Sequence, residues 1–411
     1  MQHVLFDTNH VGSILDDPLH KSWLVKDAKR QLSFFGKSLR SDGGFDVLDW
    51  QGTALPRAPQ ELHTTTRLIH SFAMAKAAGA KACDDIIDAG MSYLWQTHRD
   101  TQHGGYKWSA LPDGSGDSVK LAYGHVFVLL AASSAKQVGH ADADRLLGDV
   151  MAAIDAHYWD EEFGLHKDEF NADWTPFSTY RGMNANMHGV EALLAAFEAT
   201  EDDLFLKRAG RILDFFVGQI APSHDWRLPE HYDANWNVDP DYAGNPMFRP
   251  HGSTPGHSFE LGRLTLQHWE LTGRQDDKAP ARARRLIETA HANATQPKGG
   301  YAYTLDNSGK VAISDRYWWP VTEAIGAYAA LIKANPTPSD VEIYKELWTF
   351  AASNLIDHEH GGWFAEVDAQ NAPTQTQFQG KPDIYHALQA DLLPITPRLA
   401  NYFANAGSSL V

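Results

Sequence analysis

The stretch GGYAYTL, residues 299–305, joins a glycine pair to an aromatic ring and then to alternating apolar side chains. A glycine beside an aromatic residue recurs along the chain at roughly sixty-residue intervals, which is the sign of a repeated structural unit. One mark is missing near Asp225-Trp226-Arg227, where the spacing requires it, and counting it gives six repeats. The other marks are Gly43-Gly44-Phe45, Gly104-Gly105-Tyr106, Phe163-Gly164 and Gly361-Gly362-Trp363.

Between these marks the apolar residues recur every three or four positions, as they do in amphipathic helices. Each repeat is predicted to hold two helices, and the alternation after the glycine marks predicts small β-hairpins in the loops. The predicted helices span 17–38, 61–79, 82–99, 118–138, 142–158, 182–199, 202–218, 255–273, 277–295, 316–334, 339–357 and 381–393, with a further turn at 395–404.

Six helix pairs can stack as an open solenoid or close into a ring. Neither end of the chain shows a polar capping repeat, so closure is favoured. We therefore predict an all-α fold, an (α/α)6 barrel of twelve helices with short β-hairpins in the loops. No long polar linker divides the chain, and residues 1–411 are predicted to form a single domain.

The longest predicted non-helical segment, residues 219–254, is rich in Pro, Asn, Asp and Trp. Long loops inside a compact domain are usually functional or disordered. The rings in this one favour an ordered wall or lid over a pocket; they are Trp226, Tyr232, Trp236, Tyr242 and Phe248.

Composition excludes several classes of partner. The formal net charge of −17 argues against nucleic acid and against an anionic membrane surface. No run approaches the ~20 apolar residues that span a bilayer, and the N-terminus lacks a secretory leader pattern. Cys83 is the single cysteine, so intrachain disulfides are excluded and a cytoplasmic location is expected. The many Tyr, Phe, Trp and His residues suit either a sugar pocket or a ring-filled helical core.

Polar residues stand near the start of every second predicted helix. In a closed barrel alternate helices form the inner ring, so we expect these side chains to converge at one mouth. They are His63 and Arg67, Tyr123, Asn184 and His188, His257 and Glu260, Trp319 and Glu323, and Asp383 and His386.

Structural interpretations of single residues remain open. Arg67 could pair with Glu61 or Glu323, Asn184 and His188 could hydrogen-bond along one helix, and Trp319 could belong to the core. His188, His257 and His386 could also converge on a metal, although no i, i+4 His pair joined to a carboxylate ligand supports one.

Imidazoles in a polar pocket suit proton transfer near neutral pH, because one can act as base while another acts as acid. Proton transfer between adjacent sugar carbons passes through an enediolate, whose charge Arg67 could stabilise. This chemistry requires no redox cofactor.

Four motifs resemble the N-acylglucosamine 2-epimerase superfamily, in order and over essentially the whole chain. They are YRGMNANMHGVEA (180–192), GSTPGHSFELGRL (252–264), WWPVTEA (318–324) and KPDIYHAL (381–388). The resemblance implies an (α/α)6 barrel that isomerises or epimerises a small-molecule monosaccharide without metal or other cofactor, as a monomer or homodimer.

By motif, the resemblance implies that His257 and His386 are the acid/base pair. His386 would take the C2 proton, and His257 would assist ring opening and proton return. His188 would be a third histidine at the sugar, and Arg67 would hold the reacting oxygens. The implied lining residues are Asn184, Glu260, Tyr123, Trp319 and Glu323, and His63 and Asp383 complete the predicted substrate site.

Departures from the family pattern bear on the substrate. Met247 and Ala365 stand where relatives acting on a sulfonated sugar carry an arginine and a glutamine, and His63 replaces a tryptophan. A neutral hexose is therefore expected, with mannose–fructose isomerisation through a cis-enediol, and lyxose as a further substrate. The alternatives are a cellobiose- or N-acylglucosamine-type 2-epimerase, an (α/α)6 glycoside hydrolase using Glu260 and Glu323, and a non-catalytic sugar-binding module.

Overall fold

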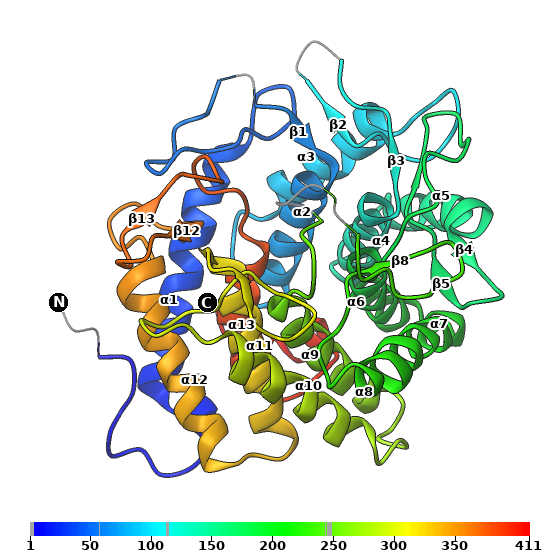
Figure 1. Cartoon of the computed structure of the whole chain (residues 1–411). Helices are drawn as coiled ribbons and strands as arrows, with labels where there is room; N and C mark the ends of the chain where they lie inside the picture. The colour runs from blue at the N-terminus through cyan, green and yellow to red at the C-terminus, as the bar shows by residue number, and fades with distance from the viewer. Residues whose placement is uncertain (1–3, 57, 112–114, 243, 245–248) are drawn as a thin grey trace.

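Six inner helices follow one another around a closed ring in a computed structural model of the protein, which describes residues 4–56, 58–111, 115–242, 244 and 249–411 (Figure 1). Each inner helix packs on the next, and the last one returns to the first. They are α2 (Leu62–Ala77), α4 (Ala122–Gln137), α6 (Met183–Thr200), α9 (Pro255–Leu271), α11 (Trp318–Ala334) and α13 (Tyr385–Ile395).

Six outer helices surround this ring, each packed against an inner helix. With the inner helices they confirm the predicted (α/α)6 barrel. Within the described residues there are also two short helices, α8 (Ala221–Ser223) and α14 (Tyr402–Asn405). The outer helices are α1 (Pro18–Phe35), α3 (Asp84–Tyr93), α5 (Ala143–Ala153), α7 (Asp203–Leu213), α10 (Ala279–Ala294) and α12 (Pro338–Phe350).

Inner and outer helices differ in how their residues are buried. Every residue of α4 from Gly124 to Ala135 is buried, as expected for a helix that is apolar nearly all round. The outer helix α7 instead buries one face, through Phe205, Ala209 and Ile212. This contrast gives the barrel a continuous core between its two layers.

Helix ends depart from the predictions in a regular way. Four outer helices continue as wide π-type turns, Leu94–His98, Ile154–Tyr158, Asp214–Ile220 and Ala351–Leu355, close to their predicted ends. Three inner helices begin later than predicted, at Ala122, Trp318 and Tyr385, because the residues before them are extended or irregular and pair with neighbouring loops.

Short antiparallel strands occupy the loops. Three hairpins fit the prediction: β4 (Trp159–Asp160) with β5 (Leu165–His166), β9 (Thr304–Leu305) with β10 (Val311–Ile313), and β12 (Glu366–Val367) with β13 (Pro373–Thr374). The remaining pairs, which the sequence did not predict, join the loops of successive repeats. They are β1 (Gln60–Glu61) with β2 (Ser109–Ala110), β3 (Lys120–Leu121) with β6 (Glu169–Phe170), β7 (Arg181–Gly182) with β8 (His231–Tyr232), and β11 (Arg316–Tyr317) with β12.

The pairing between repeats fixes where inner helices start. The first backbone N–H of α2 donates to Trp108 O at 2.7 Å, and that of α4 donates to Asp168 O at 2.8 Å. The first N–H of α6 donates to Glu230 O at 3.0 Å, and that of α11 to Ala365 O at 3.1 Å. Because four helix starts are tied in the same way to the next repeat, their first turns reach the same end of the barrel.

The glycine marks form left-handed turns. Gly105, Gly300 and Gly362 have φ of +67°, +71° and +70°, a region that favours glycine. At the repeat without a glycine mark, Asp225 and Trp226 adopt φ of +52° and +63° instead. The fourth repeat, which lacks the glycine mark, therefore keeps the left-handed backbone at the predicted place.

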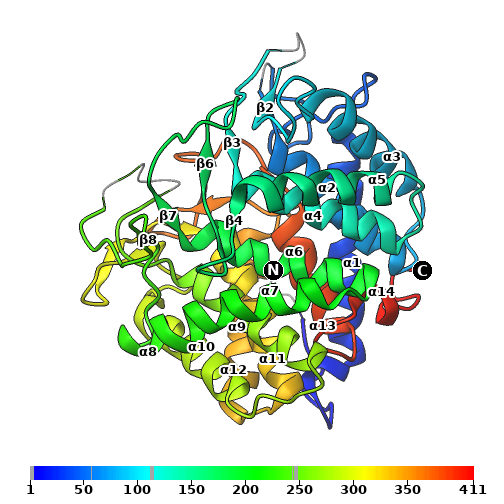
Figure 2. The ribbon, with the colours of Figure 1, turned by 90° about the vertical axis from the view of Figure 1, so that its right-hand side faces the viewer.

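The strand-bearing loops gather at one end of the barrel, opposite α14 and the C-terminus (Figure 2). The predicted loop 219–254 begins with helical residues and contains β8. Tyr232 and Trp236 are buried against Phe215 and Phe216 and so belong to the core rather than to a lid. Phe248 lies outside the described residues. No helix of the described chain is long and apolar enough to cross a membrane.

Candidate active site

Arg67 on α2 is the buried cation of the site. Its Nη1 donates to Asp383 Oδ2 at 2.6 Å, and its Nη2 donates to the Tyr123 hydroxyl at 2.9 Å. The guanidinium also lies 4.6 Å from the ring centroid of Phe127 and 4.7 Å from that of Tyr385. The predicted pairing with Glu61 or Glu323 is wrong, because α13 closes the ring next to α2 and brings Asp383 to the guanidinium.

His386 at the start of α13 is held by a carboxylate. Its Nδ1 lies 2.7 Å from Glu323 Oε1 on α11. Burial, and then the charge of Arg67, lower the pKa of His386 to about 3, so its ring is neutral at neutral pH. When Glu323 is ionised it can only accept a hydrogen bond, which places the hydrogen on Nδ1 of His386 and leaves the Nε2 lone pair free.

His257 in the first turn of α9 has the same kind of partner. Its Nδ1 lies 3.0 Å from both oxygens of Glu230, a residue that the sequence analysis did not select. Glu230 also accepts the backbone N–H of Thr254 at 3.1 Å, while its own carbonyl accepts the first N–H of α6. The sequence held one clue to Glu230, which is its position. Glu230 comes directly before β8 as Asp168 comes directly before β6, and the carbonyl of each accepts the first N–H of an inner helix.

Trp319 links the two histidines. Its ring centroid lies 5.1 Å from that of His257 and 6.0 Å from that of His386. A side chain at Gly256 would meet the Trp319 ring at 2.2 Å, so the glycine in the TPGH motif lets the indole pack on the α9 backbone. Trp319 is half-buried, which places it between core and pocket.

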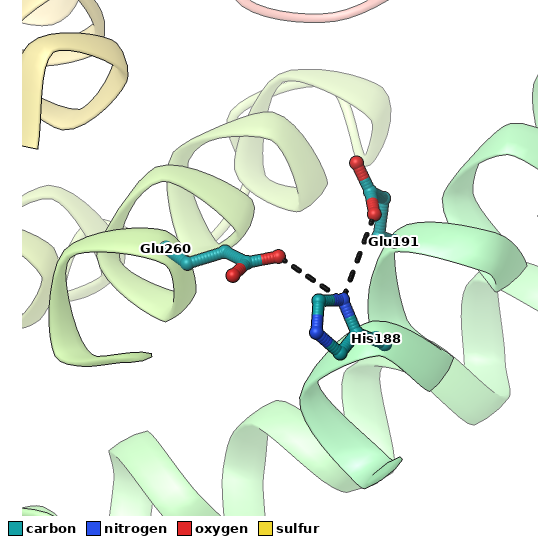
Figure 3. Close-up of side chains that lie close together, drawn as sticks. All are labelled: His188, Glu191 and Glu260. Atoms are coloured by element: carbon teal, nitrogen blue, oxygen red, sulfur yellow. Dashed lines mark ion pairs between the residues drawn. The ribbon is translucent and has the colours of Figure 1, made fainter. Parts of the chain in front are cut away.

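His188 on α6 faces two carboxylates (Figure 3). Its Nδ1 lies 3.3 Å from Glu260 Oε1 and 3.9 Å from Glu191 Oε2, as the dashed lines show. Burial disfavours the charged ring, but Glu260 and then Glu191 outweigh burial and raise the pKa of His188 to about 9. His188 is therefore an imidazolium at neutral pH, unlike His386.

Several buried polar atoms at this end have no hydrogen-bond partner among the described residues. They include Asn184 Oδ1 at the start of α6 and both oxygens of Glu260, of which Oε1 is ion-paired with His188. The considered hydrogen bond between Asn184 and His188 is not formed in this structure. These atoms can accept hydrogen bonds from sugar hydroxyls, since buried polar atoms rarely remain unpaired.

His63 lies beside the Arg67 pair. Its ring stacks on Trp108 with centroids 5.1 Å apart and an interplanar angle of 10°, and its centroid lies 5.9 Å from that of Tyr123. The Tyr123 ring in turn lies 5.3 Å from the His188 ring. Trp108 was not predicted, because it sits before a loop strand rather than on an inner helix.

The considered three-histidine metal site is not assembled, since each imidazole meets a different carboxylate. Among the described residues, the groups whose donor atoms lie within 4.8 Å of one another are His188, Glu191 and Glu260, and Glu260, Glu323 and His386. Of these two groups, His188, Glu191 and Glu260 have the donor types that a divalent cation would need. Arg263 Nη2, however, lies 3.9 Å from Glu260 Oε1 and would repel one.

The site is thus a closed helical barrel whose mouth gathers neutral and charged imidazoles beside a buried guanidinium. The chain matches the family model of N-acylglucosamine 2-epimerase (GlcNAc 2-epimerase) over residues 43–390. The chain belongs to the N-acylglucosamine 2-epimerase family, and it is a sugar isomerase in the broad sense of that family.

Relatives named as sugar isomerases support this placement. The chain is 38% identical to a D-mannose isomerase of Pseudomonas cannabina pv. alisalensis, covering 98% of this chain and 99% of that protein. It is also 38% identical to a D-mannose isomerase of Thermobifida fusca, covering 94% and 98%. A crystal structure of a D-mannose isomerase superposes with a TM-score of 0.86 at 31% identity, covering 91% of this chain and 97% of that one.

A more distant structure shows the fold alone. The cellobiose 2-epimerase from Bacillus thermoamylovorans superposes with a TM-score of 0.81 at 21% identity, covering 91% of this chain and 99% of that chain. The barrel is therefore shared by enzymes that are named for different substrates and reactions.

Proposed function

We propose that this protein interconverts D-mannose and D-fructose, and also D-lyxose and D-xylulose, by proton transfer through a cis-enediol. The observation that carries the proposal is the pair of carboxylate-held imidazoles, His386 with Glu323 and His257 with Glu230, on either side of Trp319. The D-mannose isomerases among its relatives, matched over nearly their whole length, support the choice of sugar.

The proposed reaction begins with ring opening, in which His257 moves a proton from O1 to O5. The neutral Nε2 of His386 then accepts the C2 proton of the open-chain aldose. The electron pair forms the C1–C2 double bond, and the negative charge develops on O1. Arg67 and the imidazolium of His188 stabilise that charge. Return of the proton to C1, with transfer of the O2 proton to O1, gives the ketose without any net redox change.

Residues lining the site are proposed to select a neutral sugar. Ala365 is buried and its carbonyl is tied to the start of α11, so it offers no group to a sulfonate. Met247 lies outside the described residues. We further propose Asn184, Glu260, Tyr123, Trp319, Glu323, His63 and Asp383 as the substrate-binding set.

Several properties of the whole protein are part of the same proposal. They are a single catalytic domain over residues 1–411, a cytoplasmic location, independence of metals and other cofactors, and a monomeric or homodimeric state.

The direct test is incubation of the purified protein with D-mannose, once after EDTA treatment and once with added divalent cations. Fructose formed at the same rate in both arms supports the proposal. The absence of fructose in both arms would overturn it. Glucose in place of fructose would instead indicate a 2-epimerase, which would place deuterium at C2 of the epimer in heavy water.

The glycoside hydrolase alternative fits the geometry poorly. The nearest oxygens of Glu260 and Glu323 lie within 4.8 Å of each other, whereas an inverting pair is about 6.5–9.5 Å apart. Glu323 is also occupied by His386 and Arg263.

A further inference from the structure

Arg263 is a buried cation that lies behind the proposed catalytic residues. It stands on α9 one turn after Glu260, and its side chain is only 3% exposed. Its Nη2 donates to Glu323 Oε2 at 3.1 Å, and its Nη1 donates to Gln267 Oε1 at 3.4 Å. A side chain at Gly326 would meet Arg263 Cδ at 3.2 Å, so this glycine on α11 makes room for the arginine stem.

Glu323 joins this arginine to His386. One of its oxygens accepts from Arg263 and the other lies 2.7 Å from His386 Nδ1. The carboxylate is buried, and burial raises its pKa above the ordinary value, while Arg263 offsets part of that rise. The charge on Glu323 therefore depends on the guanidinium behind it.

The other charged groups around Glu323 come from α6, α9 and α13. Glu191 raises the pKa of Glu323 further, whereas His188 lowers it, and Glu260 Oε1 lies 3.9 Å from Arg263 Nη2. Tyr385 on α13 donates its hydroxyl to Glu191.

More remote charges act on two neighbouring histidines, His386 and His70, whose pKa values burial already lowers. Arg67 lowers the pKa of His386, and Asp383 raises it. His70 on α2 also senses Arg263, which lowers its pKa. Among these groups Arg263 is the only cation that contacts Glu323 by a guanidinium hydrogen bond, within the part of the chain described.

The protonation of Glu323 decides which nitrogen of His386 carries the hydrogen. An ionised Glu323 accepts from Nδ1–H and leaves the Nε2 lone pair free for the sugar. A protonated Glu323 donates to Nδ1 and drives the hydrogen to Nε2, where it blocks the base. A single proton on Glu323 thus turns a base into a hydrogen-bond donor.

We propose that Arg263 is a positioning residue that keeps Glu323 ionised and so holds His386 in the tautomer with a free Nε2. This inference rests on the proposed function, because it assigns His386 as the base. It predicts that kcat/KM falls at low pH as Glu323 takes up a proton, and we call this part of the pH profile the acid limb. Removing the guanidinium moves that acid limb to higher pH, because the buried carboxylate loses its counter-charge.

The experiment measures kcat/KM for mannose between pH 5 and 9 in the wild type, Arg263→Gln and Arg263→Lys. For Arg263→Gln we expect the acid limb to move up by about one unit or more, as loss of a close opposite charge does. The loss of kcat/KM should then be larger at pH 6 than at pH 8. In Arg263→Lys the acid limb should lie close to its wild-type pH, because the lysine restores most of the positive charge beside Glu323. Arg284→Gln, which breaks an ion pair with Asp340 on the outer layer, is the matched control and should keep the wild-type limb.

Two further variants keep the test decisive if Arg263→Gln does not fold. Gly326→Ala pushes on Arg263 without removing its charge and should move the limb in the same direction by less. Glu323→Gln should abolish the limb, and the effects of Arg263→Gln and Glu323→Gln should not add, since both act through one carboxylate.

An unchanged acid limb in Arg263→Gln, or additive losses in the double variant, would overturn the role of Arg263. In the fallback set, an unchanged limb in both Gly326→Ala and Glu323→Gln would overturn it equally. A wild type that makes no fructose refutes the proposed function instead, so the two failures are distinguishable.

Discussion

Each of the three site histidines turns Nδ1 towards a carboxylate, yet the consequences differ. His386 and His257 each have one carboxylate partner, whereas His188 lies between two. The pKa of His386 is lowered to about 3 and that of His188 is raised to about 9. Opposite shifts within one pocket separate a base from a cation, as acid/base chemistry requires.

Glu230 should matter for catalysis although it lies on a loop. Glu230→Gln keeps the shape but removes the carboxylate that orients His257. We expect kcat to fall by about 10²–10⁴-fold, because the amide can donate to Nδ1 and so favour the wrong tautomer of an acid/base histidine. Steady-state isomerisation measures it, and Glu161→Gln, in the exposed pair with Arg211, is the control. A wild-type rate in Glu230→Gln would show that His257 needs no carboxylate.

The raised pKa of His188 predicts a pH-dependent stability. A group whose folded pKa is raised contributes stability that is fully present below its unfolded pKa, near 6.5, and lost as pH rises through about 9. The contribution is on the order of 3 kcal/mol. Thermal unfolding of wild type and His188→Gln from pH 6 to 10 should show the largest difference near pH 6 and a shrinking one through pH 9. A difference that stays constant with pH would contradict the charged state of His188.

At the level of elements, groups from neighbouring segments fix the ends of several inner helices. The starts of α2, α4, α6 and α11 are tied to the next repeat by backbone hydrogen bonds. At the opposite end Lys333 of α11 donates to Leu393 O at 2.5 Å, to Arg398 O at 3.1 Å and to Thr396 Oγ1 at 3.3 Å. Lys333 thus holds the end of α13, the helix that begins with the proposed base.

Removing that ammonium should destabilise the fold rather than the chemistry. Lys333→Met leaves the partly buried carbonyl of Leu393 and the exposed carbonyl of Arg398 without this donor, at a cost of about 1–3 kcal/mol. Urea unfolding measures this loss. Lys345→Met on α12, which breaks only an exposed pair with Glu342, should change stability by less than about 1 kcal/mol. Equal losses in the two variants would contradict a capping role for Lys333.

The element pattern was predictable because the inner helices are apolar all round and the outer ones on one face. The glycine marks were equally informative, since a left-handed turn at fixed spacing needs residues such as Gly105 and Gly300. The helix starts at Ala122 and Trp318 were missed, because pairing between loops of different repeats leaves no periodic signal in either loop alone.

At the scale of the whole molecule, ring closure assembles the site. Arg67 lies on α2, the first inner helix, and Asp383 lies just before α13, the last one. Their ion pair at 2.6 Å joins these two helices where the ring closes, a place we call the seam. Sequence motifs placed both residues at the barrel mouth but not as partners. Glu230 and Arg263 escaped selection for the same reason, because their roles depend on which helix faces them in three dimensions.

Breaking the seam pair should therefore be costly. Asp383→Asn leaves the buried guanidinium of Arg67 without its counter-charge, and we expect a loss of about 3–5 kcal/mol in the free energy of unfolding. Chemical denaturation measures it, with Glu161→Gln as a surface-pair control expected to lose less than about 1 kcal/mol. A loss in Asp383→Asn no larger than in the control would show that the closure does not depend on this pair.

The central claim is that imidazoles at the barrel mouth move a proton between neighbouring sugar carbons. The most direct measurement is fructose formation from D-mannose by wild type, His386→Ala and His257→Ala, with thermal unfolding confirming that each variant is folded. We predict that the wild type makes fructose and that each folded variant loses turnover by a factor of about 10²–10⁴. Turnover within tenfold of wild type in either variant would contradict the account.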